Sequence, residues 1–270
     1  MMSFRGGWLA NLRFPFDTVG LLTDVAEARG RQELYTRQEP QRLKALRETA
    51  LIQSVESSNR IEGVTIAPDR LIPLVLEDAK PRDRSEEEIR GYGRALDWIH
   101  TSAADLEITP DLLRRLHRLI QEGGNNAGEW RQVPNGIPEL QSGAPPLSDP
   151  QAAIDELCLS YRHIINQRLA PPLLAVPALV FDFLCIHPFR EGNGRVSRLL
   201  SVLALDQHGF EVVRYVSLAR LIEESRGDYY DVMRRSSEGW HEGKHDILPG
   251  LNYFLTIVKR AYGKLAAGQA

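Results

Sequence analysis

The sequence has little cysteine, and its two thiols stand apart. Of 270 residues only Cys158 and Cys185 are cysteines, and neither belongs to a Cys-x-x-Cys pair. A disulfide framework and a zinc knuckle are therefore disfavoured. Both thiols are expected to be buried and reduced, as in a cytoplasmic protein.

A long hydrophobic run and a surplus of one charge are also missing. The most apolar stretch, residues 171–186, carries three prolines and an aspartate, and it is shorter than the roughly 20 residues that a membrane helix needs. The first residues contain no apolar core of the kind found in a signal peptide. With 33 basic and 36 acidic side chains the formal net charge is −3, so no global field attracts phosphates. These absences predict a cytoplasmic protein that binds neither membranes nor nucleic acid.

What is present is an ordinary globular composition with a helical pattern. Hydrophobic residues make up 43% and charged residues 26% of the chain, close to the averages for soluble domains. Apolar side chains recur at three- and four-residue steps in residues 39–59, which indicates an amphipathic helix that Gly63 closes. We expect further helices at residues 68–78, 85–104, 109–121, 149–167, 174–186, 194–208, 217–237 and 246–264.

One segment departs from the helical pattern. Residues 128–147 interleave apolar side chains with several prolines and glycines. Such a composition predicts a short hairpin or an irregular flap. The fold class expected is therefore mainly α, with one short β-hairpin.

The densest group of chemically reactive residues is the run 187–198, His-Pro-Phe-Arg-Glu-Gly-Asn-Gly-Arg-Val-Ser-Arg. Pro188 disfavours helical geometry at His187, so the preceding helix is expected to stop there and to leave the imidazole at the entrance of a loop. Gly192, Asn193 and Gly194 suit positive-φ turns whose amides converge on an anion. The helix that follows adds the positive end of its dipole.

The charged residues of this run complete a predicted site for a nucleotide polyphosphate. Arg195 and Arg198 are three apart and share one helix face. Glu191 is a hard oxygen ligand of the kind that Mg²⁺ uses, and His187 has an ordinary pKa near ~6.5, suited to a general base. Any one of these residues alone could be an ordinary surface arginine or a hydrogen-bonded histidine without a catalytic role. That interpretation does not explain why all of them occur together.

The run resembles, position by position, the signature of the Fic family, His-Pro-Phe-x-(Asp/Glu)-Gly-Asn-Gly-Arg-x-x-Arg. The resemblance implies a Fic-type helical bundle that transfers AMP from ATP to a protein hydroxyl and releases pyrophosphate. It also implies a role for each matching residue: His187 as base, Glu191 as Mg²⁺ ligand, Gly192, Asn193 and Gly194 as the phosphate-holding turn, Arg195 and Arg198 on the β- and γ-phosphates, and Phe189 as a buried anchor. Doc-type phosphotransferases carry Lys where this chain has Gly194.

A second motif resembles that of a self-inhibited subclass. Residues 58–63, Ser-Asn-Arg-Ile-Glu-Gly, are similar to the inhibitory pattern (Ser/Thr)-x-x-x-Glu-(Gly/Asn). Ser58 and Glu62 are four apart and therefore share a helix face. The resemblance implies that Glu62 pairs with Arg198 and withholds it from the γ-phosphate. The alternative is a helix end with a solvated glutamate.

The resemblance extends to looser features. Residues 128–147 look like the family's flap, which would dock an extended segment of the target protein. Tyr230 belongs to a tyrosine pair on a predicted helix, where a family contact to adenine is expected; an aromatic pair of this kind is more often core. The implied organisation is an N-terminal arm at 1–38, an inhibitory helix region at 39–68 and a catalytic domain at 69–270, packed as one unit.

Several alternatives stay open at this stage. A hydrolase that uses Glu62 to remove AMP, and a non-catalytic module that senses ATP, are rival functions. Self-modification and a homodimer are compatible with the sequence. Residues 241–245 match the zinc-binding pattern His-Glu-x-x-His, but Gly239, Gly243 and Pro249 oppose the continuous helix that this pattern requires, so we expect no zinc there.

Overall fold

The computed structural model describes residues 2–7, 9–37, 40–132 and 149–268. Within these ranges the chain forms helices and turns and no strand. The α-helices are α1 Phe16–Gly30, α2 Glu33–Thr36, α3 Pro40–Ile61, α4 Pro68–Leu76, α5 Arg84–Ser102, α6 Pro110–Ile120, α7 Pro150–Asn166, α8 Pro172–Ile186, α9 Asn193–Gln207, α10 Leu218–Glu224, α11 Arg226–Ser237 and α12 Leu248–Ala266. Short 3-10 helices lie at η1 Met2–Gly7, η2 Leu9–Asn11, η3 Ala103–Asp105 and η4 Glu211–Arg214. The mainly α class is confirmed.

The predicted β-hairpin flap is not confirmed. Its first residues, 128–132, are irregular, and residues 133–147 lie outside the described part of the chain. The prediction of one helix over 217–237 is wrong, because α10 and α11 are separate helices. Ser225 lies between them with non-helical backbone angles, and its hydroxyl donates to the carbonyl of Leu221 and contacts the hydroxyl of Tyr253. A serine that bonds its own backbone in this way competes with helix continuation.

Two helices occupy the centre of the molecule. Apart from Pro172 and Val180, every residue of α8 is buried, and apart from Gly194 and Gln207 every residue of α9 is buried. A helix that is apolar on all sides needs partners on all sides. α8 packs against α7, α9 and α12, while α9 also contacts α5, α6 and α10. The loop that joins α8 to α9 is therefore anchored at both ends by the core.

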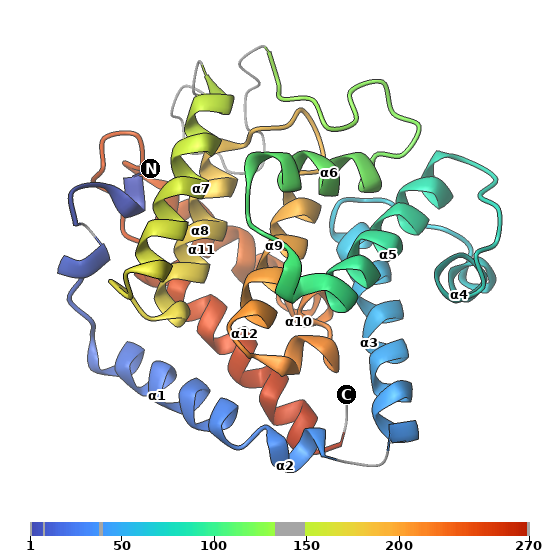
Figure 1. Ribbon diagram of the computed structural model, residues 1–270, viewed down its shortest axis with the longest axis horizontal. Helices are drawn as coiled ribbons and strands as arrows, with labels where there is room; N and C mark the ends of the chain where they lie inside the picture. Colours follow the sequence, from blue (N-terminus) through green and yellow to red (C-terminus); the bar gives the residue numbers. More distant parts are fainter. Residues whose placement is uncertain (1, 8, 38–39, 133–148, 269–270) are drawn as a thin grey trace.

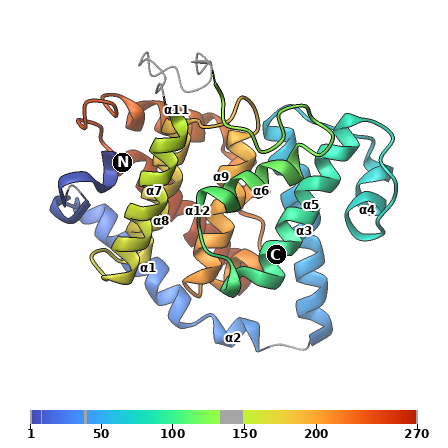
Figure 2. The same cartoon turned by 45° about the horizontal axis from the view of Figure 1, so that its top comes forward.

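The remaining helices surround this pair (Figure 1). α1 lies along one edge beside α12, whereas α3, α4 and α5 lie on the opposite side, an arrangement that the turned view repeats (Figure 2). The N-terminal arm is tied to the core by specific polar contacts. Gln32 donates to the carbonyl of Gly209 at 2.8 Å and accepts from the hydroxyl of Tyr262 at 2.8 Å, and Lys259 pairs with Asp24 at 2.7 Å.

Helix starts follow the sequence signals closely. Thr109 caps α6 by accepting the N–H of Leu112 at 3.2 Å, and Pro110 occupies the first turn. α5 starts at Arg84, one residue earlier than expected, because Asp83 accepts the N–H of Glu86 at 2.9 Å and caps the helix. A carboxylate is among the best N-caps. None of the helices in the described ranges is long and apolar enough to cross a membrane.

Candidate active site

The loop between α8 and α9 begins at a residue with an unusual backbone. α8 ends at Ile186, and His187 adopts the left-handed conformation with φ 50° and ψ 60°. Its N–H donates to the carbonyl of Phe183 at 3.0 Å. Pro188 blocks a further helical turn at this point, so the chain reverses and the imidazole faces the cavity described below.

The loop is closed by one asparagine and by a buried ring. The Asn193 side chain accepts the N–H of Phe189 at 3.0 Å and donates to the carbonyl of the same residue at 2.9 Å. Phe189 is fully buried; its ring stacks on His117 at 3.9 Å and on Trp130 at 4.7 Å between centroids. Gly192, with φ 76°, precedes α9 in the left-handed conformation that favours glycine. The first backbone N–H groups of α9 have no partner within the helix.

A cavity of about 450 Å³ lies above this loop. That volume is within the range of small-molecule sites. Nine of the residues singled out from the sequence line it: Glu62, His187, Glu191, Gly192, Asn193, Gly194, Arg195, Arg198 and Tyr230. Ser58 lies behind the cavity and Phe189 beneath the loop. Residues more than a hundred positions apart in the chain are thus brought to one place.

Arg198 is held by the two residues of the predicted inhibitory motif. Its Nη2 donates to Oε1 of Glu62 at 2.6 Å and to the carbonyl of Ser58 at 2.9 Å, and its Nε donates to the Ser58 hydroxyl at 2.7 Å. The Arg198 side chain is only 5% exposed. Burial by itself would raise the pKa of Glu62, but the charge and hydrogen bond of Arg198 outweigh it and lower the pKa. Glu62 is therefore ionised and bound to Arg198 at neutral pH.

The Glu62 carboxylate also lies against the start of α9. A Cβ atom at position 194 would overlap its Oε1 and lie 3.1 Å from its Cδ, so only glycine leaves room for this approach. A helix N-terminus with a nearby guanidinium is the place where an anion binds most favourably. In this conformation a carboxylate of the protein itself occupies that place.

Arg195 has a partner that the sequence analysis missed. Its Nη1 donates to Oε2 of Glu88 on α5 at 2.5 Å and to Oδ1 of Asn59 at 3.3 Å. Both side chains of the Arg195–Glu88 pair are below a tenth exposed. Arg84 links this pair to Glu191, because it donates to Glu88 at 2.8 Å and to Glu191 at 3.1 Å. The only sequence signal for Glu88 was a carboxylate on the apolar face of an amphipathic helix.

His187 is neutral at physiological pH. Its pKa is lowered to about 4, first by burial and then by the positive charge of Arg131; the carbonyl of Leu184 and the carboxylate of Glu62 act in the opposite direction. A neutral imidazole has a lone pair with which to accept a proton.

Both tyrosines of the predicted pair line the cavity, and they differ in their other contacts. Tyr230 lines the cavity, and the guanidinium of Arg226 lies over its ring at 5.5 Å. Tyr229 contacts the rings of both Tyr230 and Tyr253 and also borders a second cavity.

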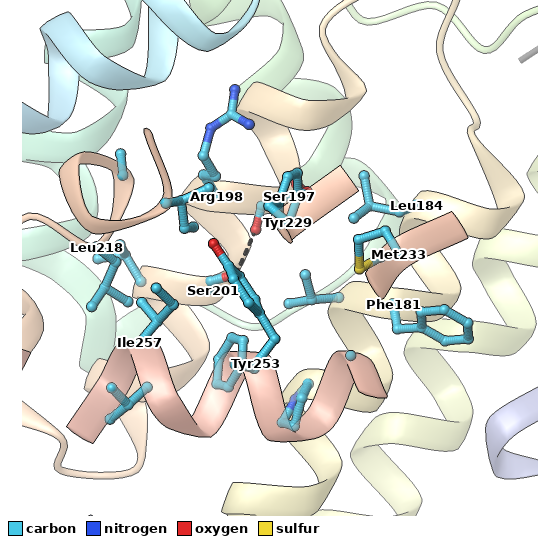
Figure 3. A pocket seen from close by; sticks show the side chains of 18 of the residues that line it. Phe181, Leu184, Ser197, Arg198, Ser201, Leu218, Tyr229, Met233, Tyr253 and Ile257 are labelled. Carbon is cyan, nitrogen blue, oxygen red and sulfur yellow. Dashed lines mark hydrogen bonds between the residues drawn. The ribbon is translucent and has the colours of Figure 1, made fainter. Parts of the chain in front are cut away.

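This second cavity is apolar and holds about 60 Å³ (Figure 3). It lies between α9 and α12, and the Arg198 guanidinium points away from it (Figure 3). A volume of this size admits a few water molecules and is too small for a nucleotide, so the larger cavity is the candidate site.

The donor set agrees with Mg²⁺ held jointly with a substrate. In the described ranges no three His, Cys, Asp or Glu side chains cluster as metal ligands. Glu191, whose side chain is 63% exposed, offers one carboxylate at the cavity. Mg²⁺ commonly takes one or two carboxylates and completes its shell with water and phosphate oxygens, so Glu191 fits this use. Residues 241–245 form a turn rather than one helix, with Gly239 and Gly243 at positive φ, so the zinc-binding pattern is not built.

Comparison with known proteins identifies the family. Residues 107–205 match the model of the Fic/DOC family. The chain is a Fic family protein. It is 30% identical over 228 residues to "Protein adenylyltransferase Fic" of Drosophila virilis, covering 81% of this chain and 43% of that protein. It is 24% identical over 221 residues to the protein of the same name in Nematostella vectensis, covering 78% and 48%. This Fic chain thus spans less than half the length of these curated relatives.

Solved Fic structures share the fold. The structure of a Fic domain containing signaling protein from Bacteroides thetaiotaomicron superposes with a TM-score of 0.75 at 19% identity, over 92% of this chain and 99% of that one. Fic-1 from C. elegans superposes with a TM-score of 0.73 at 20% identity, over 93% and 72%. The family accounts for the helical arrangement around the α8–α9 loop. The contacts of Glu62, Glu88 and Arg84 described above come from the structure of this chain and not from the comparison with other proteins.

Proposed function

We propose that this Fic protein is a self-inhibited protein adenylyltransferase that transfers AMP from ATP to a hydroxyl group of a target protein. One observation carries the proposal: the carboxylate of Glu62, the residue that follows α3, occupies the anion position at the start of α9, directly on Arg198. When a side chain of the same protein occupies an anion site, the site is inhibited until that side chain is displaced. The names of the curated relatives support the chemistry.

In the proposed reaction the nucleotide displaces Glu62. Arg198 would then bind the γ-phosphate and Arg195 the β-phosphate, and the backbone amides at residues 192–194 would donate hydrogen bonds to the phosphate oxygens. Tyr230, which lines the cavity, would contact the adenine ring. Residues 128–147 would align the target segment beside the site. An exposed hydroxyl group of a second copy of the chain is an equally suitable acceptor of AMP. Self-modification and a homodimer are therefore compatible with the proposal.

Proton transfer is assigned to His187. The target hydroxyl oxygen attacks the α-phosphorus in line, its proton passes to the neutral imidazole of His187, and the bond to the β-phosphate oxygen breaks so that pyrophosphate leaves. Arg195 and Arg198 stabilise the charge that develops on the leaving group. Mg²⁺ bound by Glu191 and the phosphates would neutralise part of this charge.

The test is AMP transfer measured by mass spectrometry in a lysate and on the protein itself. We expect Glu62→Gly to label protein strongly, the unaltered chain to label weakly, and Glu62→Gly with His187→Ala to give no label. Glu56→Gly is the control, because Glu56 lies on α3, the helix that leads to Glu62, but pairs with Arg60. Nucleotide binding without a covalent product in Glu62→Gly would instead support an ATP-sensing module.

A second candidate reaction is removal of AMP from a modified protein. It is favoured by the position of Glu62, which lines the same cavity as His187 and is ionised, so that its carboxylate can orient a water molecule toward a bound phosphodiester. The two reactions predict opposite results. Glu62→Gly would abolish the removal of AMP from a modified substrate, whereas it would activate the transfer of AMP to a target.

A further inference from the structure

The first residues of the segment 128–147, where a flap was expected, have a role of their own. Gly128, Trp130 and Arg131 all contact the underside of the α8–α9 loop or its support. The Gly128 N–H donates to Nδ1 of His117 at 2.8 Å, and Trp130 stacks on Phe189. Because Nδ1 of His117 accepts, the proton of this buried imidazole is on Nε2, which donates to the carbonyl of Glu191 at 3.1 Å.

Arg131 makes the most direct contacts with the loop. Its Nε donates to the carbonyl of His187 at 2.8 Å, and its Nη2 donates to the carbonyl of Ile186 at 3.2 Å. Its backbone N–H donates to the carbonyl of Pro188 at 2.9 Å. Arg131 is only 7% exposed. The last carbonyls of a helix lack intrahelical partners. Here the guanidinium of Arg131 satisfies two carbonyls at the end of α8, those of Ile186 and of the candidate catalytic residue His187.

The backbone of His187 needs such support. A residue other than glycine is strained in the left-handed conformation, and His187 is one of three such residues in the described part of the chain. Hydrogen bonds from a charged donor are stronger than those between neutral groups. The two bonds from Arg131 therefore oppose the strain and favour the left-handed conformation.

We propose that Arg131 is a positioning residue for His187: its guanidinium fixes the left-handed turn that aims the imidazole into the cavity. This inference rests on the proposed function for its consequence in catalysis, but the geometry that it describes is independent of the reaction. It assigns residues 128–131, the first part of the segment 128–147, to the support of the active-site loop, so that target docking in the proposed function falls to the rest of that segment.

The charge of Arg131 also acts on the imidazole. After burial, it is the largest influence that lowers the pKa of His187. The opposing charge is that of Glu62, and the same cavity holds Arg84, Glu88, Arg190, Glu191, Arg195 and Arg198. Replacing Arg131 by an uncharged side chain should therefore raise the pKa of His187, while replacing it by lysine should leave that pKa nearly unchanged.

Three variants in the Glu62→Gly background separate these effects. Arg131→Met removes both charge and hydrogen bonds. Arg131→Lys keeps the charge but cannot bridge two carbonyls in the fixed fork of a guanidinium. Arg114→Met is the matched control, because Arg114 donates to the carbonyl of Gly128 at 2.9 Å in the same segment without touching His187.

Two readouts are measured on each variant. The first is the titration of His187 by NMR of labelled imidazoles, assigned by the signal that His187→Gln removes; it needs no enzymatic activity. The second is the kinetics of AMP transfer against pH. We expect Arg131→Met to raise the His187 pKa and to lower kcat about 100-fold, with KM for ATP changed less than about twofold, because a misplaced catalytic group costs rate rather than substrate binding. Arg131→Lys should keep the low pKa and still lose kcat.

Opposite outcomes would overturn the proposal. If Arg131→Met titrates like Arg114→Met and loses activity only in proportion to the unfolded fraction seen in thermal melts, Arg131 is a structural residue and no more. If the Glu62→Gly parent transfers no AMP, the proposed function fails, while the His187 titration and a crystal structure of Arg131→Lys still show whether Arg131 sets the conformation of His187.

Discussion

The carboxylate of Glu62 lies so close to the α carbon of Gly194 that a Cβ atom at position 194 would overlap its Oε1 atom. The two residues are far apart in the sequence, and they meet because α3 and α9 pack together. This contact, with the bond from Arg198, places a protein carboxylate where the phosphate of a nucleotide would be held. It also links the proposed self-inhibition to the glycine in the first turn of α9.

The first prediction concerns the coupling between these two residues. Gly194→Ala should destabilise the protein when Glu62 is present, because the new methyl group overlaps the carboxylate. In Glu62→Gly the nearest remaining atom to that methyl is Nη1 of Arg198 at 3.2 Å, which can move. A double-mutant cycle on the free energy of unfolding should give a coupling of at least about 1 kcal/mol. Additive effects would show that Glu62 does not occupy this position in solution.

The second prediction concerns nucleotide affinity. Glu62→Gly should tighten ATP binding about tenfold or more, because the nucleotide no longer has to break a charge-assisted bond worth about 1.5–3 kcal/mol. Isothermal titration calorimetry on the unaltered chain, Glu62→Gly and Glu62→Gln measures this directly. Glu62→Gln should fall between the other two, because it keeps a hydrogen-bond acceptor and loses the charge. Equal affinity of all three proteins would contradict the assignment of Glu62 as a competitor of the nucleotide.

Local signals in the sequence account for much of the fold and for the loop. Pro188 stops α8, the Gly-Asn-Gly run turns the chain, and Thr109 with Pro110 starts α6, because each of these effects acts within a few residues. The family resemblance supplied Ser58 and Glu62. Neither the local signals nor the resemblance indicated the roles of Glu88, Arg84 and Arg131. Their partners at the site are determined only by the packing of segments that are distant in the chain. The division of residues 217–237 into two helices was missed for a related reason: Ser225 acquires its second partner, Tyr253, from α12.

The third prediction concerns pH and the N-terminal arm. Ser3 donates to Asp182 on α8 through its N–H at 3.1 Å and its hydroxyl at 2.7 Å, and Trp240 donates to the same carboxylate at 2.7 Å. Burial raises the pKa of Asp182 to about 6, and these hydrogen bonds oppose the rise only in part. The folded state therefore holds this proton more tightly than the unfolded state. The stabilisation is full below the ordinary pKa near ~3.9 and is lost as the pH rises through about 6.

Asp182→Asn removes this titration. Relative to the variant, the unaltered chain should lose stability on the order of 3 kcal/mol between pH 4 and pH 8. Urea unfolding at both pH values measures it, with Asp105→Asn as the exposed control. A difference between chain and variant that is the same at both pH values would show that Asp182 does not titrate in this range.

The fourth prediction separates two buried carboxylates on one helix. Glu86 and Glu88 both lie on α5, both are nearly fully buried, and each pairs with an arginine, Glu86 with Arg70 at 2.8 Å and Glu88 with Arg195 at 2.5 Å. Replacing either by glutamine leaves its arginine without a counter-charge. For Arg195, which is 4% exposed, the cost of an unpaired buried charge is about 3–5 kcal/mol.

Of these two carboxylates, Glu88 lines the cavity beside the α8–α9 loop and Glu86 does not. If that cavity binds ATP as proposed, the two variants differ in their response to ATP. In Glu88→Gln the cations Arg84 and Arg195 both lack their shared carboxylate, so a bound triphosphate supplies the missing negative charge. In the Glu62→Gly background we expect Glu88→Gln to lower the melting temperature without ligand and to bind ATP about tenfold more tightly, because roughly 1.4 kcal/mol of the unpaired charge is recovered on binding. Glu86→Gln should be destabilised with its ATP affinity unchanged. Calorimetric titration of both variants decides the point: equal affinities would mean that Arg195 does not meet the phosphates, and the assignment of its role would have to be withdrawn.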